Sequence, residues 1–300
     1  AGRDPPNQLR LRFDGEGNWF KAAVYFDRAN HGQFNTTWGR SDAGAFPGPG
    51  LLNLAPIMPE KEQRQIGLAL ISAFLEATLH DRQEYRALFR DLRLGQDWLP
   101  ATAYIARYAQ AGTSWIATYE EDLNARTATM PGATTGGQDL AQWYEKVVDK
   151  KWSDQDTIGV YLGWSRTTGT RSASYHLDLP ATLPAGPNAT LVLDLAAGEV
   201  YSQPLDLSIE VVDRTGQAAS LPLSQFAPLQ PQIEFHTLKH NLLEKPGTRS
   251  AEPVFQTYEF PLAAFQARNP NLAASLATIR LVMDRSPEGL VILDNVGVRP

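Results

Sequence analysis

The stretch "ATIRLVMDRSPEGLVILDNVGVRP" (residues 277–300) decides the fold expected for the larger part of the chain. Two apolar runs, 277–283 and 290–299, stand on either side of a turn rich in Asp, Arg, Pro and Gly. Short apolar runs bounded by such residues are typical of β-strands rather than helices. The C-terminal end is therefore predicted to form two strands.

The same pattern extends upstream over more than half of the chain. Comparable short runs, spaced by turn residues, occupy positions 157–165, 172–180, 189–198, 205–217 and 254–265. Several short strands at such spacing indicate a sandwich or a jelly roll. Residues 113–300 are thus predicted to form an all-β domain, with "PGATTGGQ" (131–138) as a linker-like stretch inside it.

The first third of the chain has a different pattern. "WFKAAVYF" (19–26) is a nearly continuous apolar run, as expected for a strand buried on both faces of a parallel sheet. Residues 60–80 are predicted to form a helix, and 81–92 a second, shorter one. The apolar positions with helical spacing in the longer segment are Ile66, Leu70, Ile71, Phe74, Leu75 and Leu79. Residues 1–112 are therefore expected to belong to the α/β class.

Composition excludes several classes of function. A formal charge of −6 and a pI near 5.4 disfavour nucleic acid as a partner, because phosphate-binding surfaces are usually basic. The absence of cysteine removes disulfides, thiolate nucleophiles and Cys-ligated zinc. No apolar run approaches the ~20 residues that cross a bilayer. Any targeting region is expected upstream of Ala1, so the sequence leaves the compartment open.

Three segments carry a resemblance to a known family. "ANHGQFNTTWGR" (29–40), "LLNLAPIMPEKEQRQIGLALISAFLEATLH" (51–80) and "LFRDLRLGQDWLP" (88–100) resemble the C-terminal portion of bacterial α/β-hydrolases, specifically chlorophyllase-like and polyester-hydrolase-like serine esterases. The resemblance covers residues 10 to about 108. It implies that His31 is the base of a Ser-His-Asp triad, although Arg28 stands where the family usually has glycine.

The other members of such a triad are not evident. The family's nucleophile lies in G-x-S-x-G, which this chain lacks, so the serine is expected upstream and the chain alone is expected to be inactive. Asp4 is the candidate acid within the chain, and an acid upstream of Ala1 is the alternative. The resemblance also suggests that Trp38, Gln33 and Asn35 line the mouth of an ester-binding site.

The β-rich part has a resemblance of its own. "VFQTYEFPLAAF" (254–265) and "SLATIRLVMDRSPEGLVILDNVGVR" (275–299) resemble the closing strands of galactose-binding-like or carbohydrate-binding jelly rolls. In such modules an acid on the last strand ligates a structural calcium, which makes Asp294 a candidate oxygen ligand. Tyr201, Tyr258 and Trp164 could form a platform for stacking sugars, but alternating aromatic residues on strands are more often core.

Three hypotheses follow. The leading one is the C-terminal part of a serine ester hydrolase, with His31 as base, an upstream part of the same polypeptide as partner and a small or polymeric ester as substrate. The second is a non-catalytic carbohydrate- or surface-binding sandwich on a remnant scaffold. The third is a purely structural sandwich, which predicts no ligand. No cofactor other than the possible calcium is expected.

Overall fold

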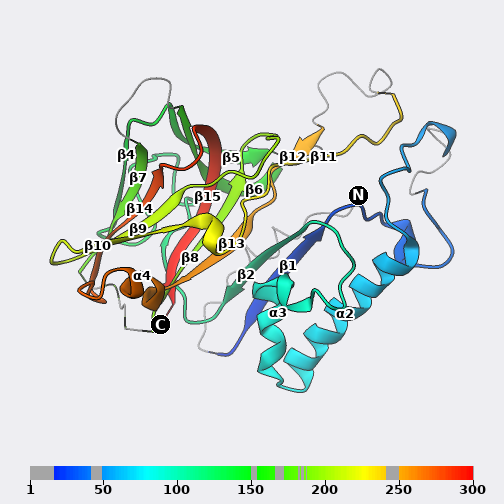
Figure 1. The fold of residues 1–300 in the computed structure, drawn as a ribbon, viewed down its shortest axis with the longest axis horizontal. Coiled ribbons are helices and arrows are strands. Elements are labelled where there is room, and N and C mark those ends of the chain that lie inside the picture. Colours follow the sequence, from blue (N-terminus) through cyan, green and yellow to red (C-terminus); the bar gives the residue numbers. More distant parts are fainter. Residues whose placement is uncertain are drawn as a thin grey trace.

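The computed structural model describes residues 17–41, 49–149, 154–165, 172–181, 183, 186, 188–240 and 250–299. Figure 1 shows a large β-sandwich with a smaller layer of two strands and two helices beside it. None of the helices in these residues is long and apolar enough to span a membrane.

The sandwich consists of two antiparallel sheets. The first contains five strands in the order β10-β9-β14-β7-β4, and the second contains β13-β8-β15-β6-β5, with β3 pairing to β15. The strands of the first sheet are β4 (Thr134–Gln138), β7 (Ala173–Asp178), β9 (Ser208–Asp213), β10 (Ala218–Pro222) and β14 (Leu276–Met283). Those of the second are β3 (Ser114–Ala117), β5 (Gln142–Asp149), β6 (Asp154–Ser165), β8 (Thr190–Ala197), β13 (Gln256–Pro261) and β15 (Glu288–Arg299).

The core lies between these sheets, because alternate residues of each strand point inward. Leu193, Phe260 and Leu281 are completely buried there, and the short helix α4 (Leu262–Arg268) closes one end with Phe265. The hydroxyl groups of Tyr119 and Tyr175 lie 3.1 Å apart in the core and form a hydrogen bond. The all-β sandwich expected for the larger part of the chain is confirmed.

One segment of the sandwich differs from the prediction made for it. The stretch 131–138, expected to be a linker, instead supplies β4, which pairs antiparallel with β7. At the edge of the second sheet lies β5, in which Trp143, Glu145 and Val147 alternate with outward residues. A five-residue strand at a sheet edge contributes too few alternating positions to be recognised from sequence.

The smaller layer joins β1 (Phe20–Phe26) and β2 (Tyr104–Gln110) to α2 (Glu60–Leu79) and α3 (Arg86–Arg90). Phe20, Ala22 and Val24 pack against a cluster that includes Leu88 and Phe89 of α3. The expectation of a parallel strand buried on both faces is wrong, because β1 pairs antiparallel with β2 and all seven of its residues are half-buried. The two helices are confirmed, although 83–85 forms a 3-10 turn (η3) ahead of α3.

The remaining elements are short connections. They are the 3-10 turns η1 (Gly32–Phe34), η2 (Pro49–Leu51), η4 (Leu92–Gly95) and η5 (Leu223–Gln225), and the paired strands β11 (Ile233–Glu234) and β12 (Ala251–Glu252). Leu52, just after η2, forms an isolated bridge with Leu238. The arm from Ile233 onward thus reaches back to the N-terminal part of the chain.

Candidate functional site: a buried joint and the cleft beside it

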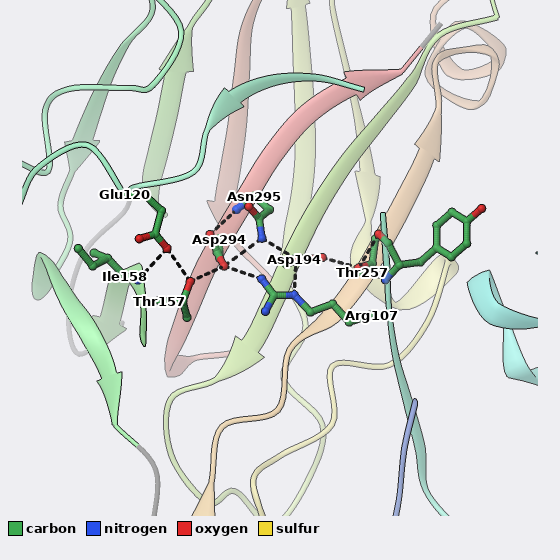
Figure 2. A network of polar contacts seen from close by, with 9 residues as sticks. Arg107, Glu120, Thr157, Ile158, Asp194, Thr257, Asp294 and Asn295 are labelled. Carbon is green, nitrogen blue, oxygen red and sulfur yellow. Dashed lines mark hydrogen bonds and ion pairs between the residues drawn. The ribbon is translucent and has the colours of Figure 1, made fainter. Parts of the chain in front are cut away.

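A buried arginine joins the smaller layer to the sandwich. Arg107 of β2 donates from Nε to Asp194 of β8 at 2.7 Å and from a terminal nitrogen to Asp294 of β15 at 2.6 Å. All three side chains are almost fully buried, and the guanidinium also lies over the ring of Phe255 at 4.9 Å. Figure 2 shows the guanidinium between the two carboxylates, which are direct neighbours on paired strands. We call these three residues, with the groups that bind their carboxylates, the joint.

The two carboxylates are held by further donors from the sandwich. The hydroxyl of Thr257 on β13 donates to Asp194, and it also accepts the backbone N–H of Tyr108 at 2.9 Å. The amide of Asn295 donates 3.0 Å bonds to Oδ2 of both aspartates. Asn295 has a left-handed backbone (φ 50°) at the point where the register of β15 shifts. This irregularity turns the Asn295 amide toward the aspartates, so the local distortion of β15 is part of the joint.

A third carboxylate extends the joint at its far end (Figure 2). Glu120 accepts from the hydroxyl of Thr157 at 2.8 Å and from the backbone N–H of Ile158 at 3.2 Å. The Thr157 hydroxyl also lies 3.4 Å from Asp294. Asp294 therefore lies between the guanidinium of Arg107 and, through the Thr157 hydroxyl, the carboxylate of Glu120.

Burial and the neighbouring charges together set the ionisation of the joint. Burial raises the pKa of Asp294 to about 7, and Arg107 offsets this only in part because Asp194 and Glu120 add their repulsion. Burial also disfavours the charged form of Arg107, but the two aspartates outweigh it and keep the pKa of the guanidinium above its usual value. Arg107 is therefore always charged, while Asp294 can hold a proton near neutral pH.

A cleft of about 660 Å³ opens beside the joint. One wall is formed by residues 90–93, 96, 99–104 and 106 of the smaller layer, and the other by residues 226–228, 230, 256–259 and 261 of the sandwich. Thr257 belongs to both the cleft and the joint, so the joint fixes the distance between the walls. The volume of the cleft is in the range of small-molecule sites, roughly 300–1,000 Å³.

The cleft combines apolar surfaces with unengaged amides. Leu99, Tyr104 and Phe226 supply apolar walls, and the Phe226 ring is fixed edge-on against Phe260 with centroids 4.5 Å apart. Three glutamines line the same space, and none of their side-chain amides makes a hydrogen bond within the described residues. They are Gln96, Gln230 and Gln256. Each carboxamide can both donate and accept.

The charged groups of the cleft are paired with one another. Arg93 forms two 2.7 Å bonds with Asp91. Glu259 binds Arg299 through both oxygens, at 2.9 and 2.7 Å, and lies 3.7 Å from Arg90. No His, Cys, Ser or Lys is among the described residues that line the cleft. Burial raises the pKa of Tyr104 to about 12, so its hydroxyl stays a neutral donor, bound to the carbonyl of Pro100 at 2.6 Å.

His31 lines neither the cleft nor the joint and lies on an exposed turn at the start of η1. Its ring meets the edge of Trp38 with centroids 5.1 Å apart, and Trp38 is 59% exposed. Asn35, expected at a site mouth, accepts the backbone N–H groups of Thr37 and Trp38 and so forms a turn. Asp4 lies outside the described residues.

Gln33 has an internal role. Its side chain is buried and donates to the carbonyl of Met58 at 2.9 Å and to the Gln63 amide oxygen at 3.2 Å. Gln63 in turn binds the backbone of Asn30 in both directions, at 3.0 and 2.6 Å. The "ANHG" turn is thus fixed to the first turns of α2 by two buried glutamines.

The other candidate residues occupy the sandwich. Trp164 and Tyr258 are buried, and Tyr201 is half-buried against the same cluster, which confirms the core interpretation of these aromatics. The cation that Asp294 contacts is the guanidinium of Arg107. Within the described parts of the chain, no group of three or more His, Cys, Asp or Glu side chains could hold a metal ion.

Sequence reasoning did not single out Arg107, Asp194 or the three cleft glutamines. One local signal exists: Arg107 interrupts the otherwise apolar strand "YIARYA", and a charge in such a strand needs a buried partner. Its partners are 87 and 187 residues away in the chain, so no local pattern could identify them.

Comparison with known proteins finds a likeness to β-sandwich domains. No protein-family model and no curated protein matches the chain. A family 30 carbohydrate-binding module from a cellulosomal cellulase of Clostridium thermocellum is similar at 13% identity and a TM-score of 0.40, over 62% of this chain and 96% of that one. The K2 cleaved adhesin domain of Lys-gingipain is similar at 11% identity and a TM-score of 0.39, over 63% and 99%.

An exo-β-agarase is similar at 12% identity and a TM-score of 0.40, over 62% of this chain. The match spans only 25% of the agarase chain. The antiparallel β1–β2 pair and the predominance of strands overturn the α/β-hydrolase resemblance of residues 1–112. The interpretation of the chain as part of a serine ester hydrolase with His31 as base is therefore wrong.

Proposed function

We propose that this chain is a non-catalytic binding protein that takes a neutral oligosaccharide in the cleft beside the joint. The observation that carries the proposal is the set of three unengaged carboxamides, those of Gln96, Gln230 and Gln256, on an apolar-walled cleft of about 660 Å³. The cleft alone carries it, because likenesses at TM-scores of 0.40 and below say nothing about a ligand.

The chemistry of the cleft matches a polyhydroxylated ligand. Sugar hydroxyl groups donate and accept at the same time, and carboxamides complement both roles. The apolar faces of pyranose rings pack against flat aromatic surfaces, which Phe226 and Tyr104 can supply. Because Arg93 is paired with Asp91, and Arg90 lies against Glu259, the described residues that line the cleft offer no unpaired charge to a phosphate or sulfate group.

The same residues disfavour catalysis. A general acid or base is most effective with a pKa near the working pH. The Tyr104 hydroxyl does not meet this condition, and Glu259 is engaged by two arginines. Binding without turnover is therefore the activity that the cleft supports.

Calorimetric titration tests the proposal. Neutral oligosaccharides of glucose, xylose, mannose and galactose, and one sulfated oligosaccharide, are titrated into the full chain. At least one neutral oligosaccharide should bind, and Gln230→Ala with Gln256→Ala should weaken it at least tenfold, since two hydrogen-bonding groups are lost. Gln142→Ala is the matched control, because it lies on β5 at the opposite edge of the same sheet from β13.

Two results would contradict this function. Preference for the sulfated oligosaccharide would mean that the cleft recognises negatively charged ligands. Absence of binding by every saccharide would favour a second candidate, a structural role, which the buried joint itself supports because it fixes two layers rigidly together.

A further inference from the structure

The outer face of α2 carries an apolar stripe exposed to solvent. The inner face of this helix buries Gln63, Ile66, Ala73 and Ala77 against the rest of the smaller layer. On the opposite face Leu68, Ile71 and Leu79 are 71%, 62% and 72% exposed, and Leu75 is 43% exposed. Figure 1 shows α2 at the outside of the molecule, away from the sandwich.

Neighbouring aromatics widen the stripe into a patch. Phe74 is exposed on the flank of the stripe, and the ring of exposed Phe34 lies against Gly67 of α2. These six side chains expose on the order of 500 Å² of apolar surface, the scale of the largest patch on a typical monomer, roughly 300–600 Å². A patch of this size on one helix marks an interaction surface. A helix that is apolar on both faces is normally covered on both.

We propose that this patch, the α2 stripe with Phe34 and Phe74, binds the same patch of a second copy of the chain, with the two α2 helices antiparallel around a two-fold axis. Leu68, Ile71 and Leu75 are spaced by three and four residues, as in the seam between paired helices. Reversing the helix around the point between Ile71 and Ser72 places Leu68 opposite Leu75, as an isologous contact requires.

The size of the patch and the charge of the chain favour a second copy of the chain over other partners. A stable dimer buries about 800 Å² per partner, and the exposed apolar surface of the patch, on the order of 500 Å², would supply more than half of it. Nucleic acid is disfavoured by the net charge of −6. A membrane surface is disfavoured because the acidic residues Glu60, Glu62 and Glu76 of α2 outnumber its basic ones, Lys61 and Arg64, whereas interfacial helices are usually rich in Lys and Arg.

Sedimentation velocity over a concentration series provides the first test. The full chain of 33.1 kDa should shift toward twice its mass as concentration rises. Leu68→Ser with Leu75→Ser should raise the dissociation constant at least tenfold, with an unchanged circular dichroism spectrum. Leu94→Ser with Leu123→Ser is the matched control, because both leucines are more than 60% exposed and lie off α2. A monomer at every concentration overturns the proposal.

Cross-linking tests the geometry separately. The chain has no cysteine, so Ser72→Cys places a single thiol close to the expected axis. Mild oxidation should link two copies of S72C rapidly, while Ser220→Cys, exposed on β10, should link at least tenfold more slowly. Equal rates for the two variants overturn the antiparallel arrangement. Capture of an unrelated protein would not support the proposal.

Discussion

The sandwich and the smaller layer differ in how completely they bury their apolar side chains. The sandwich buries the inward side chains of both of its sheets against each other, with Phe260, Leu193 and Leu281 completely enclosed. The smaller layer has one two-stranded sheet and one long helix, and α2 leaves several of its large apolar residues in solvent. A region that covers its own apolar surface is stable by itself, whereas one that does not depends on its attachments. Here the attachments are the joint and the partner proposed for α2.

The largest expected effect tests the self-sufficiency of the sandwich. Phe260→Ala should lower the free energy of unfolding by about 3–5 kcal/mol, because the ring is fully buried among Phe226, Tyr258 and Phe265 and its loss leaves a cavity. Denaturant titration measures it. Phe74→Ala, a matched change on α2 where the ring is 45% exposed, should cost about 1 kcal/mol. Equal losses would remove the contrast between the two regions.

The next effect tests the joint. Arg107→Met should cost about 3 kcal/mol, because it leaves Asp194 and Asp294 buried without their cation. The cost falls at the low end for a buried pair because Asp294 can take up a proton. Limited proteolysis should then cleave the smaller layer before the sandwich.

A triple variant distinguishes charge from packing at the joint. Adding Asp194→Asn and Asp294→Asn to Arg107→Met removes the uncompensated charge, so most of the lost stability should return. If the triple variant is as unstable as Arg107→Met alone, the guanidinium acts by filling space rather than by neutralising carboxylates.

The contrast between these regions was only partly accessible from the sequence. Alternating apolar residues predicted the sandwich strands, because burial on one face is a local pattern that repeats every two residues. The helical spacing from Ile66 to Leu79 predicted α2 correctly, but periodicity says nothing about what covers a face. Ile66 is buried, whereas Leu79 is exposed.

Non-local pairing explains the errors. The apolar run 19–26 suggested a parallel strand because continuous apolar sequence is usual there, but the direction of a strand depends on its partner, and β2 begins more than 75 residues after β1. The hydrolase resemblance drew attention to His31, Gln33 and Trp38 and away from the cleft. The cleft and the joint are assembled from strands that only the fold brings together.

An effect of similar size concerns the pH dependence of the joint. Burial raises the pKa of Asp294 from its ordinary value of 3.8 to about 7, so between these values the folded chain holds a proton that the unfolded chain has released. The free energy of unfolding should therefore fall as the pH rises from about 4 to 7, by roughly 3 kcal/mol.

Comparison with variants isolates this contribution. In denaturant titrations at a series of pH values, the free energy of unfolding of Asp294→Asn should fall less over that window than the free energy of unfolding of the wild type. Glu145 needs a parallel control, Glu145→Gln, because burial, with Glu121 and Asp122, also raises the pKa of Glu145 to about 7. A wild-type stability that rises through the window relative to Asp294→Asn would show that Asp294 is ionised in the folded chain and that Arg107 outweighs its burial.

The smallest effect lies within α2 itself. Leu68→Ser should change the free energy of unfolding of the monomer by less than about 0.5 kcal/mol, because the side chain is mostly in solvent. Ile66→Ser, two residues earlier on the buried face, should cost several times more. Measured in dilute solution, the pair separates the contacts that α2 makes within the chain from those it offers to a second copy. A large loss from Leu68→Ser under those conditions would mean that the outer face already packs within one chain, and the smaller layer would then be as self-contained as the sandwich.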